Sequence, residues 1–384
     1  MQIAIVQRRL THYRVPLFER LRARLADEGH DLLLIHGQPA PHEEEKRDAG
    51  ELDWALRIRN RYAPPTGSKH LCWQPLPDAV RTAHLLIIAQ ENRLLSNYPF
   101  LLRRRPAQRL AFWGHGANLQ AGRTQGLSER FKRWTTNRVD WWFAYSDASF
   151  ELVARAGFPP ERITVLNNAV DTAQLQQLRG AIPCAQTRAL RDALGFGESP
   201  VGIYLGSLYA DKRLDFLIEA AQAVRHSIPQ FRLMLMGDGP ERSKVLAWIG
   251  RHDWIRWVGA QTGSQKVAHL LTGQVMLNPG TVGLVMLDSF ALGLPLVTTH
   301  CGIHGPEIAY LQNGCNGVMT ENSTAAYARA VVQLLTDAAQ HARLRDACLA
   351  SAAKYSIDDM TQRYVAGMRS ALQASSMDAA RVPA

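Results

Sequence analysis

Apolar residues along this chain recur in two alternating patterns. Short runs such as Ile3–Val6, Leu32–Ile35 and Leu85–Ala89 are typical of buried strands. Between the first two runs, residues 16–27 place apolar side chains at helical spacing and end close to Gly29, which favours a helix. Strands that alternate with helices predict a doubly wound parallel sheet.

This alternation occurs twice, so two Rossmann-like α/β domains are expected. Further strands of the first series are predicted at Leu110–Trp113, Asp140–Tyr145 and Ile163–Leu166, and those of the second at Gly202–Leu205, Arg232–Met236, Ile255–Val258, Val275–Leu277 and Leu296–Thr299. A stretch without periodicity, between about 168 and 195, predicts the hinge. We therefore expect an N-terminal domain over residues 1–170 and a C-terminal domain over residues 171–356. A last helix over about 357–374 is long enough to cross back, which assigns residues 357–384 to the first domain.

The most informative stretch runs from Asn278 to Thr299. A strand ends at a turn containing Gly280, and a helix closed by Gly293 and Pro295 follows. Small residues before a helix leave backbone N–H groups free to bind an anion, so Gly280, Val282, Gly283 and Leu284 are candidate phosphate ligands.

Asp288 lies one helical turn beyond Leu284. Its carboxylate is placed to accept hydrogen bonds from two ribose hydroxyls, as acidic residues do in dinucleotide sites. The alternative is an acidic residue that only complements the helix dipole.

Glycine turns follow three strands of the second series. They contain Gly206 with Ser207, Gly237, and Val258 with Gly259. Ligands of an open α/β sheet bind outside the carboxyl ends of its strands, so these turns should converge on one crevice. Lys212 and Arg213 follow the first turn closely enough to reach a phosphate there.

Length and composition limit the kinds of protein that this chain can be. With 384 residues, 46% hydrophobic and 20% charged, the chain is expected to be a cytoplasmic protein of two domains, because no run approaches the length of a membrane span and the first strand does not resemble a signal peptide. The five cysteines are scattered, so neither a disulfide framework nor a zinc site is indicated.

The positive charge is concentrated in the first domain. Residues 1–170 contain 25 Lys and Arg against 17 Asp and Glu, a net charge of +8 out of +10 for the chain. Nucleic acid, an anionic membrane face or an acidic acceptor could use this surface. The densest clusters are Arg103–Arg105 and Arg130 with Lys132 and Arg133; the alternative is a solvated face.

Taken together, these motifs resemble those of the family 4 glycosyltransferases of GT-B fold. The resemblance covers Gly206 to Lys212, the Gly237–Glu241 run, Val258-Gly259, and the block from Pro279 to Pro295. It implies two domains facing across a cleft and a retaining transfer of sugar from a nucleotide diphosphate donor, bound by the second domain, to a glycan or lipid-linked acceptor on the first. The similarity extends to enzymes of polysaccharide and lipopolysaccharide assembly.

Two positions depart from the family pattern. Ser207 replaces an arginine that commonly follows the first glycine, so Lys212 and Arg213 would make the diphosphate contacts. Gly280 replaces the first of two glutamates, which removes a carboxylate near the donor sugar, whereas Asp288 keeps the second in shortened form.

The resemblance also implies residues outside these turns. His115 follows a strand of the first domain, where the family has a histidine that contacts the donor sugar, although a lone histidine there is often structural. With Lys212, His115 is the candidate catalytic residue. Arg14, Asn118 and Glu307 are further candidates; Arg14 could equally be a solvated helix start, and Glu307 a plain first-turn acid.

No cofactor and no divalent metal are expected, because no Asp-x-Asp stands at a predicted strand end and residues 43–53 are interpreted as solvated surface. A GT-B sugar-nucleotide epimerase is the first alternative. A non-catalytic basic protein that binds nucleic acid is less favoured, because no aromatic RNA-binding signature supports it. A NAD dehydrogenase is disfavoured because no Gly-x-Gly-x-x-Gly follows the first strand.

Overall fold

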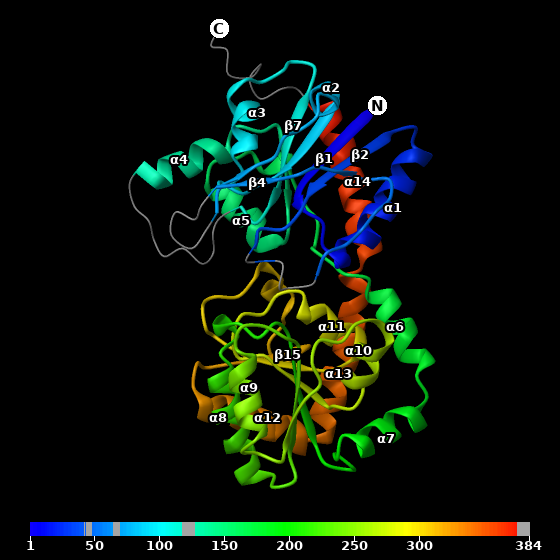
Figure 1. Cartoon of the computed structure of the whole chain (residues 1–384), viewed down its shortest axis with the longest axis vertical. Helices are drawn as coiled ribbons and strands as arrows, with labels where there is room; N and C mark the ends of the chain where they lie inside the picture. Colours follow the sequence, from blue (N-terminus) through cyan, green and yellow to red (C-terminus); the bar gives the residue numbers. More distant parts are fainter. Residues whose placement is uncertain (42, 44–47, 64–69, 117–126, 375–384) are drawn as a thin grey trace. The chain divides into compact units, whose positions relative to one another are not determined.

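A computed structural model describes residues 1–41, 43, 48–63, 70–116 and 127–374, except for four side chains in the 127–132 segment (Figure 1). The chain divides into two compact units. Unit 1 comprises Met1–Val170 with Ile357–Ala384, and unit 2 comprises Asp171–Ser356.

Unit 1 is built on a parallel sheet of seven strands in the order β3-β2-β1-β6-β7-β8-β9. Its central strands are continuously apolar, because a parallel sheet is covered by helices on both faces. The strands are β1 (Gln2–Arg9), β2 (Asp31–Gly37), β3 (Leu56–Arg57), β6 (Leu85–Ala89), β7 (Arg109–Gly114), β8 (Trp141–Ala144) and β9 (Ile163–Val165), and a small antiparallel pair is formed by β4 (Arg61–Tyr62) and β5 (Cys72–Trp73).

Helices cover this sheet. They are α1 (Val15–Asp27), α2 (Ala79–Thr82), α3 (Tyr98–Leu102), α4 (Leu127–Thr136), α5 (Asp147–Arg155) and α14 (Ile357–Gln373). Ser146 caps α5 by accepting a hydrogen bond from the Ser149 N–H group, as its position before the helix predicts.

Helix α14 returns the chain to unit 1, where it runs beside α1 (Figure 1). Ion pairs join the two helices, Arg20 to Asp358 at 2.8 Å and Arg369 to Glu28 at 2.7 Å. The buried ring of Tyr364 packs edge-on against Trp113 of β7. The prediction that the last helix belongs with the first sheet is confirmed.

Unit 2 is built on a parallel sheet of six strands in the order β12-β11-β10-β13-β14-β15. The strands are β10 (Val201–Leu205), β11 (Arg232–Met236), β12 (Ile255–Trp257), β13 (Val275–Leu277), β14 (Leu296–Thr299) and β15 (Gly317–Thr320). The helices are α6 (Thr172–Ala181), α7 (Cys184–Ala193), α8 (Leu214–Ser227), α9 (Arg242–Ile249), α10 (Gly263–Leu270), α11 (Val285–Leu292), α12 (Thr324–Thr336) and α13 (Ala338–Lys354).

The predicted pair of doubly wound parallel sheets is therefore present, with three local differences. The region expected to be an aperiodic hinge contains α6 and α7, both part of unit 2. Helix α7 buries none of its residues, and Leu190 is its only large apolar side chain. Strands β3, β4, β5 and β15 were not predicted, and β1 extends three residues beyond its apolar run, to Arg9.

Within the described part of the chain, no helix combines the length and the apolar character that crossing a membrane would require.

Gly237→Ala tests the close packing at the end of β11. A Cβ atom at Gly237 would lie 1.8 Å from the Gly206 carbonyl oxygen, and the residue has φ of 141°. We expect the free energy of unfolding in urea to fall by about 1–3 kcal/mol. Gly180→Ala is the control, because an added methyl group in α6 meets nothing within 4 Å. Equal losses in the two variants would contradict the packing argument.

Candidate functional site

The sheet of unit 2 reverses its strand order between β10 and β13. At such a switch point the loops after the two central strands separate, and ligands of open α/β sheets bind there. The two loops are residues 206–213, after β10, and residues 278–284, after β13. They contain most of the residues that the sequence predicts to bind the donor.

Three glycine turns meet at this edge of the sheet. The Gly206 N–H group donates to the Met236 carbonyl at 3.0 Å, and the Gly237 N–H group donates to the Gly259 carbonyl at 2.8 Å. Gly237 also packs directly against the Gly206 carbonyl. Because these contacts are made by backbone atoms, the turns after β10, β11 and β12 converge as the sequence predicts. Val258, which precedes Gly259, is half-buried, whereas Ser207 is exposed.

Lys212 joins the two central loops. Its ammonium group donates to the Thr281 carbonyl at 2.6 Å, while the Thr281 N–H group donates to the Asp211 carbonyl at 3.0 Å. Burial lowers the pKa of Lys212, and the negative charges of Asp211, Cys301 and Glu307 oppose that shift. An ammonium group has three donors, so the hydrogen bond to Thr281 leaves donors that a phosphate could use.

Arg213 follows Lys212 in the left-handed conformation, with φ of 57°. Its guanidinium group donates to the Pro279 carbonyl at 3.3 Å, to Thr299 at 3.1 Å and to the Asn322 side chain at 2.6 Å. Pro279 and Asn322 belong to the loops after β13 and β15, and Thr299 is the last residue of β14. Arg213 therefore ties the loops together, a position that the sequence motif alone did not indicate.

Gly280 lies against the backbone of the first loop. A Cβ atom there would be 2.3 Å from the Asp211 carbonyl oxygen and 2.5 Å from the carbonyl carbon of Lys212. Any side chain would force the loops apart. The packing of the two loops therefore requires glycine at this position.

Helix α11 begins directly after this turn. Val282 is buried and Leu284 is the N-cap residue. Asp288, in the first turns, forms an ion pair with Lys266 of α10, with Nζ and Oδ1 2.6 Å apart. Lys266 was not predicted, because it lies 22 residues from its partner and in another helix.

The loop after β14 adds three more polar groups beside α11. The buried Glu307 places Oε2 3.6 Å from where a Cβ of Gly283 would be. His304 accepts from the Val282 N–H group at Nδ1, 3.2 Å, which leaves Nε2–H to donate to the Thr299 carbonyl at 2.7 Å. The histidine thus fixes the turn that precedes α11.

Cys301 lies 3.4 Å from Nε2 of His304. Burial disfavours its thiolate, but hydrogen bonds from His304 and from the Ile303 N–H group outweigh burial and lower the pKa of the thiol. Of the loop after β14, only Glu307 was predicted; His304 and Cys301 share no recognisable spacing with the other site residues.

Unit 1 has a switch point of its own, between β1 and β6. A cavity of about 130 Å³ lies there. It is lined by Gln7, Arg8, Arg9, Thr11, Tyr13, Arg14, Phe18, Glu91 and Tyr145, which come from the end of β1, the loop and helix after it, and the residues that follow β6 and β8.

Arg14 is buried, so it is not a solvated helix start. Its guanidinium group lies over aromatic rings, 4.5 Å from the centroid of Trp113, 5.3 Å from that of Tyr145 and 5.5 Å from that of Tyr13. Such contacts stabilise a cation that has lost most of its water.

His115 follows β7, and its ring is 4.3 Å from that of Tyr145. Loss of solvation, and then the positive charge of Arg14, lower the pKa of His115 to about 4, against the opposing charge of Glu91. The side chain is nevertheless exposed to solvent, and water weakens both of these effects. Both causes favour a neutral imidazole near pH 7. Asn118, the neighbouring candidate, lies outside the described residues.

The prediction that residues 43–53 form a solvated surface is wrong for the first of them, Glu43. Glu43 is buried and binds the guanidinium group of Arg8 through both oxygens, at 2.5 and 2.8 Å. Burial opposes its ionisation, but the hydrogen bonds and the charge of Arg8 outweigh burial and lower the pKa of Glu43 to about 2. A residue in a polar stretch of sequence can thus be buried when a partner of opposite charge, here 35 residues away, neutralises it.

Not every residue of the two basic clusters lies on the surface. Arg104 binds the fully buried Asp140, whereas Arg103 and Arg105 are exposed. Arg130 and Arg133 of α4 are exposed, and the side chain of Lys132 is among those the structure does not describe. Among the described residues, no three His, Cys, Asp or Glu side chains are grouped so that they could hold a metal ion.

Two family models match the chain. The model of group 1 glycosyl transferases matches residues 199–337, and the model of Glycosyltransferase Family 4 matches residues 17–174. A curated relative, alpha-D-kanosaminyltransferase of Streptomyces kanamyceticus, is 25% identical over 80% of this chain and 78% of its own.

Solved structures share the fold. The structure of Anabaena Alr3699/HepE in complex with UDP superposes with a TM-score of 0.70 at 17% identity, covering 96% of this chain and 100% of that one. WaaG, a glycosyltransferase involved in lipopolysaccharide biosynthesis, superposes with a TM-score of 0.64 at 13% identity, covering 94% and 98%. At such identities the likeness concerns the arrangement of strands and helices.

Proposed function

The chain belongs to glycosyltransferase family 4, whose retaining enzymes use nucleotide-sugar donors, and on that premise we propose that it transfers a sugar to a glycan or lipid-linked acceptor. We further propose that unit 2 binds the donor and unit 1 the acceptor. The solved complex of Alr3699/HepE contains UDP, and WaaG is involved in lipopolysaccharide biosynthesis. By analogy, this protein would act in the assembly of a cell-surface polysaccharide or lipopolysaccharide.

The observation that supports this function best is the placement of Lys212 beside the turn before α11. Lys212 reaches the Thr281 carbonyl, so its ammonium group lies at the same turn as the first N–H groups of the helix. A departing nucleoside diphosphate gains negative charge in the transition state. Fixed donors and a positive charge at that point would stabilise it without reorganisation.

Glu307 is the carboxylate that we propose to contact the donor sugar. The turn cannot accommodate a side chain at Gly280, whereas Glu307 reaches the same turn from the loop after β14. His115 would contact the donor sugar as a neutral imidazole, which can both donate and accept a hydrogen bond.

The proposed reaction is tested by incubating the protein with UDP-, GDP- and ADP-sugars, with and without membrane glycolipid acceptors. Transfer that requires an acceptor and keeps the anomeric configuration supports the proposal. Conversion of the nucleotide sugar to its epimer without acceptor would instead identify a GT-B epimerase.

Lys212→Ala should lower kcat/KM by about a hundredfold, the scale for losing one fixed charge contact in a transition state. If Lys212 and the α11 N–H groups neutralise the diphosphate, EDTA should leave the rate of the parent enzyme unchanged. Lys244→Ala is the control, since Lys244 is exposed and pairs with Asp215 in the same unit. Activity lost in EDTA and restored by magnesium would refute this mechanism.

Asp288→Ala should weaken binding of the nucleotide by roughly 1.5–3 kcal/mol, the value of hydrogen bonds to a charged acceptor. Calorimetric titration with the preferred nucleotide measures the effect. Lys266→Ala separates the two roles of Asp288, because it breaks the ion pair and keeps the carboxylate. An equal loss in both variants would show that the ion pair, and not ribose binding, is what matters.

We also propose that unit 1 attaches to the inner face of an anionic membrane, where lipid-linked acceptors occur. Leu102 and Phe131 are 63% and 44% exposed, and Phe131 stacks on Tyr98, which joins α4 to α3. The exposed Arg103 and Arg105 follow α3 directly. Apolar side chains flanked by arginines suit an interface between anionic headgroups and acyl chains.

Replacing both Arg103 and Arg105 with Gln should weaken binding to phosphatidylglycerol vesicles by about 1 kcal/mol for each charge removed. Nucleotide affinity should not change. Arg104 is left intact because its loss would leave Asp140 buried without its partner. Replacing the exposed Arg57 and Arg59 with Gln gives the matched control, and vesicle cosedimentation is the measurement. If both double variants sediment like the parent, this surface does not bind the membrane.

A further inference from the structure

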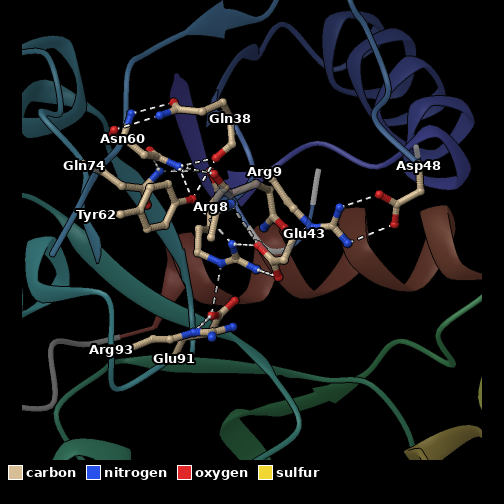
Figure 2. Close-up of polar contacts among 12 residues, drawn as sticks. Arg8, Arg9, Gln38, Glu43, Asp48, Asn60, Tyr62, Gln74, Glu91 and Arg93 are labelled. Carbon is tan, nitrogen blue, oxygen red and sulfur yellow. Dashed lines mark hydrogen bonds and ion pairs between the residues drawn. The ribbon is translucent and has the colours of Figure 1, made fainter. Parts of the chain in front are cut away.

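The cavity of unit 1 has a floor of paired arginines that the donor chemistry does not use. Arg8 is held by both oxygens of Glu43, and its Nε lies 3.4 Å from Glu91 (Figure 2). Arg9 is held in the same way by Asp48, at 2.5 and 2.9 Å. Each guanidinium plane is therefore fixed by two parallel hydrogen bonds.

A second layer of amides holds the strand that carries these arginines. Asn60 donates to the Arg8 carbonyl at 2.7 Å, and Gln74 donates to the Gln7 carbonyl at 3.1 Å (Figure 2). Both amides are almost fully buried, and Gln74 also donates to the Asn60 side-chain oxygen. Burying such groups is costly unless they are hydrogen-bonded, so this network fixes the end of β1 in one conformation.

The end of β1 departs from regular geometry at the cavity. Its pairing with β2 shifts register between Gln7 and Arg9. In a regular strand, consecutive side chains point to opposite faces of the sheet. At this irregularity the consecutive residues Arg8 and Arg9 both line the cavity.

The lining favours an anion over a neutral group. Arg8, Arg9 and Arg14 contribute three guanidinium groups to the lining and Glu91 contributes one carboxylate, while Glu43 and Asp48, which are outside the lining, bind Arg8 and Arg9. Arg14 approaches from the loop after β1 and lies on its aromatic rings, so its position does not depend on the two paired arginines. Planar guanidinium donors match the oxygens of carboxylates and phosphates. A volume of 130 Å³ accommodates one such group with part of a sugar ring, since a water molecule occupies about 30 Å³.

We propose that this cavity is a subsite for an anionic group of the acceptor, a carboxylate or a phosphate carried on a sugar. The term acceptor rests on the proposed glycosyltransferase function, whereas the anion site rests on the cavity itself. The acceptor would be an acidic glycan or a phosphorylated one, held by Arg14 with Arg8 and Arg9. Binding of the anionic group to these arginines would orient the reacting hydroxyl of the acceptor.

The test compares three sugars that differ in charge. Glucose, glucuronate and glucose 6-phosphate are titrated into the full-length protein in separate experiments, and ligand-observed NMR gives each Kd. We expect at least one anion to bind about tenfold or more tightly than glucose. Tighter binding of glucuronate would identify the acceptor's anionic group as a carboxylate, and tighter binding of glucose 6-phosphate would identify it as a phosphate. Saturating UDP should leave anion binding unchanged, because the nucleotide is assigned to unit 2.

Three variants assign the binding to the cavity. Arg14→Gln should raise the Kd of the anion about tenfold, and Arg14→Lys should recover part of that loss because it restores the charge. Arg24→Gln removes an exposed charge from α1 and should have no effect. Circular dichroism checks the fold of each variant, and if Arg14→Gln unfolds, the comparison of Arg14→Lys with the parent decides.

Two results would overturn the proposal. Equal binding of the three sugars to the parent protein would leave the arginine network a purely structural set of ion pairs. Anion binding that UDP displaces, or that a folded Arg14 variant retains in full, would place the anion elsewhere. Failure of the proposed function is separate, since it would appear as absent sugar transfer while the anion still binds to the cavity.

Discussion

The contact between the loops after β10 and β13 is the constraint on which the donor side of the molecule depends. The Thr281 carbonyl receives the Lys212 ammonium group, and the Thr281 N–H group returns to the Asp211 carbonyl. Gly280 allows this approach because it lacks a Cβ atom. The same contact positions the start of α11, and with it Asp288 and the N–H groups of the first turn. A change in one of these loops would therefore alter the position of the predicted donor ligands in the other loop and in α11.

Both units place buried cations at a switch point, but they stabilise them differently. In unit 2, Lys212 and Arg213 are held mainly by carbonyl and hydroxyl oxygens of neighbouring loops. In unit 1, Arg8 is neutralised by Glu43, and Arg14 lies on aromatic rings. A cation held by neutral oxygens keeps its full charge for an incoming anion, whereas one paired with a carboxylate contributes chiefly orientation.

Sequence patterns predicted the elements whose signals are local. Strands β6, β11, β13 and β14 begin and end with the predicted runs of residues, because a strand that is buried in a parallel sheet is apolar along its length. Gly293 ends α11 in the left-handed conformation, as its place after the last apolar residues of the helix predicts. The glycine turns after β10, β11 and β12 were likewise found from sequence, and at Gly237 the backbone of Gly206 lies too close for any side chain. Helix α7 was missed because Leu190 is its only large apolar side chain, which is too few for a helical period to be recognised.

The sequence by itself therefore determined the two series of alternating strands and helices, the glycine turns at the strand ends, and the resemblance to family 4 glycosyltransferases. Only the tertiary structure decided which charged groups meet. Lys266 reaches Asp288 from another helix, Glu43 leaves the expected polar surface to neutralise Arg8, and Arg14 is caged by rings from strands far along the chain. These contacts join residues separated by tens of positions. No local spacing encodes them, because they arise when parallel strands bring their carboxyl ends to a common edge.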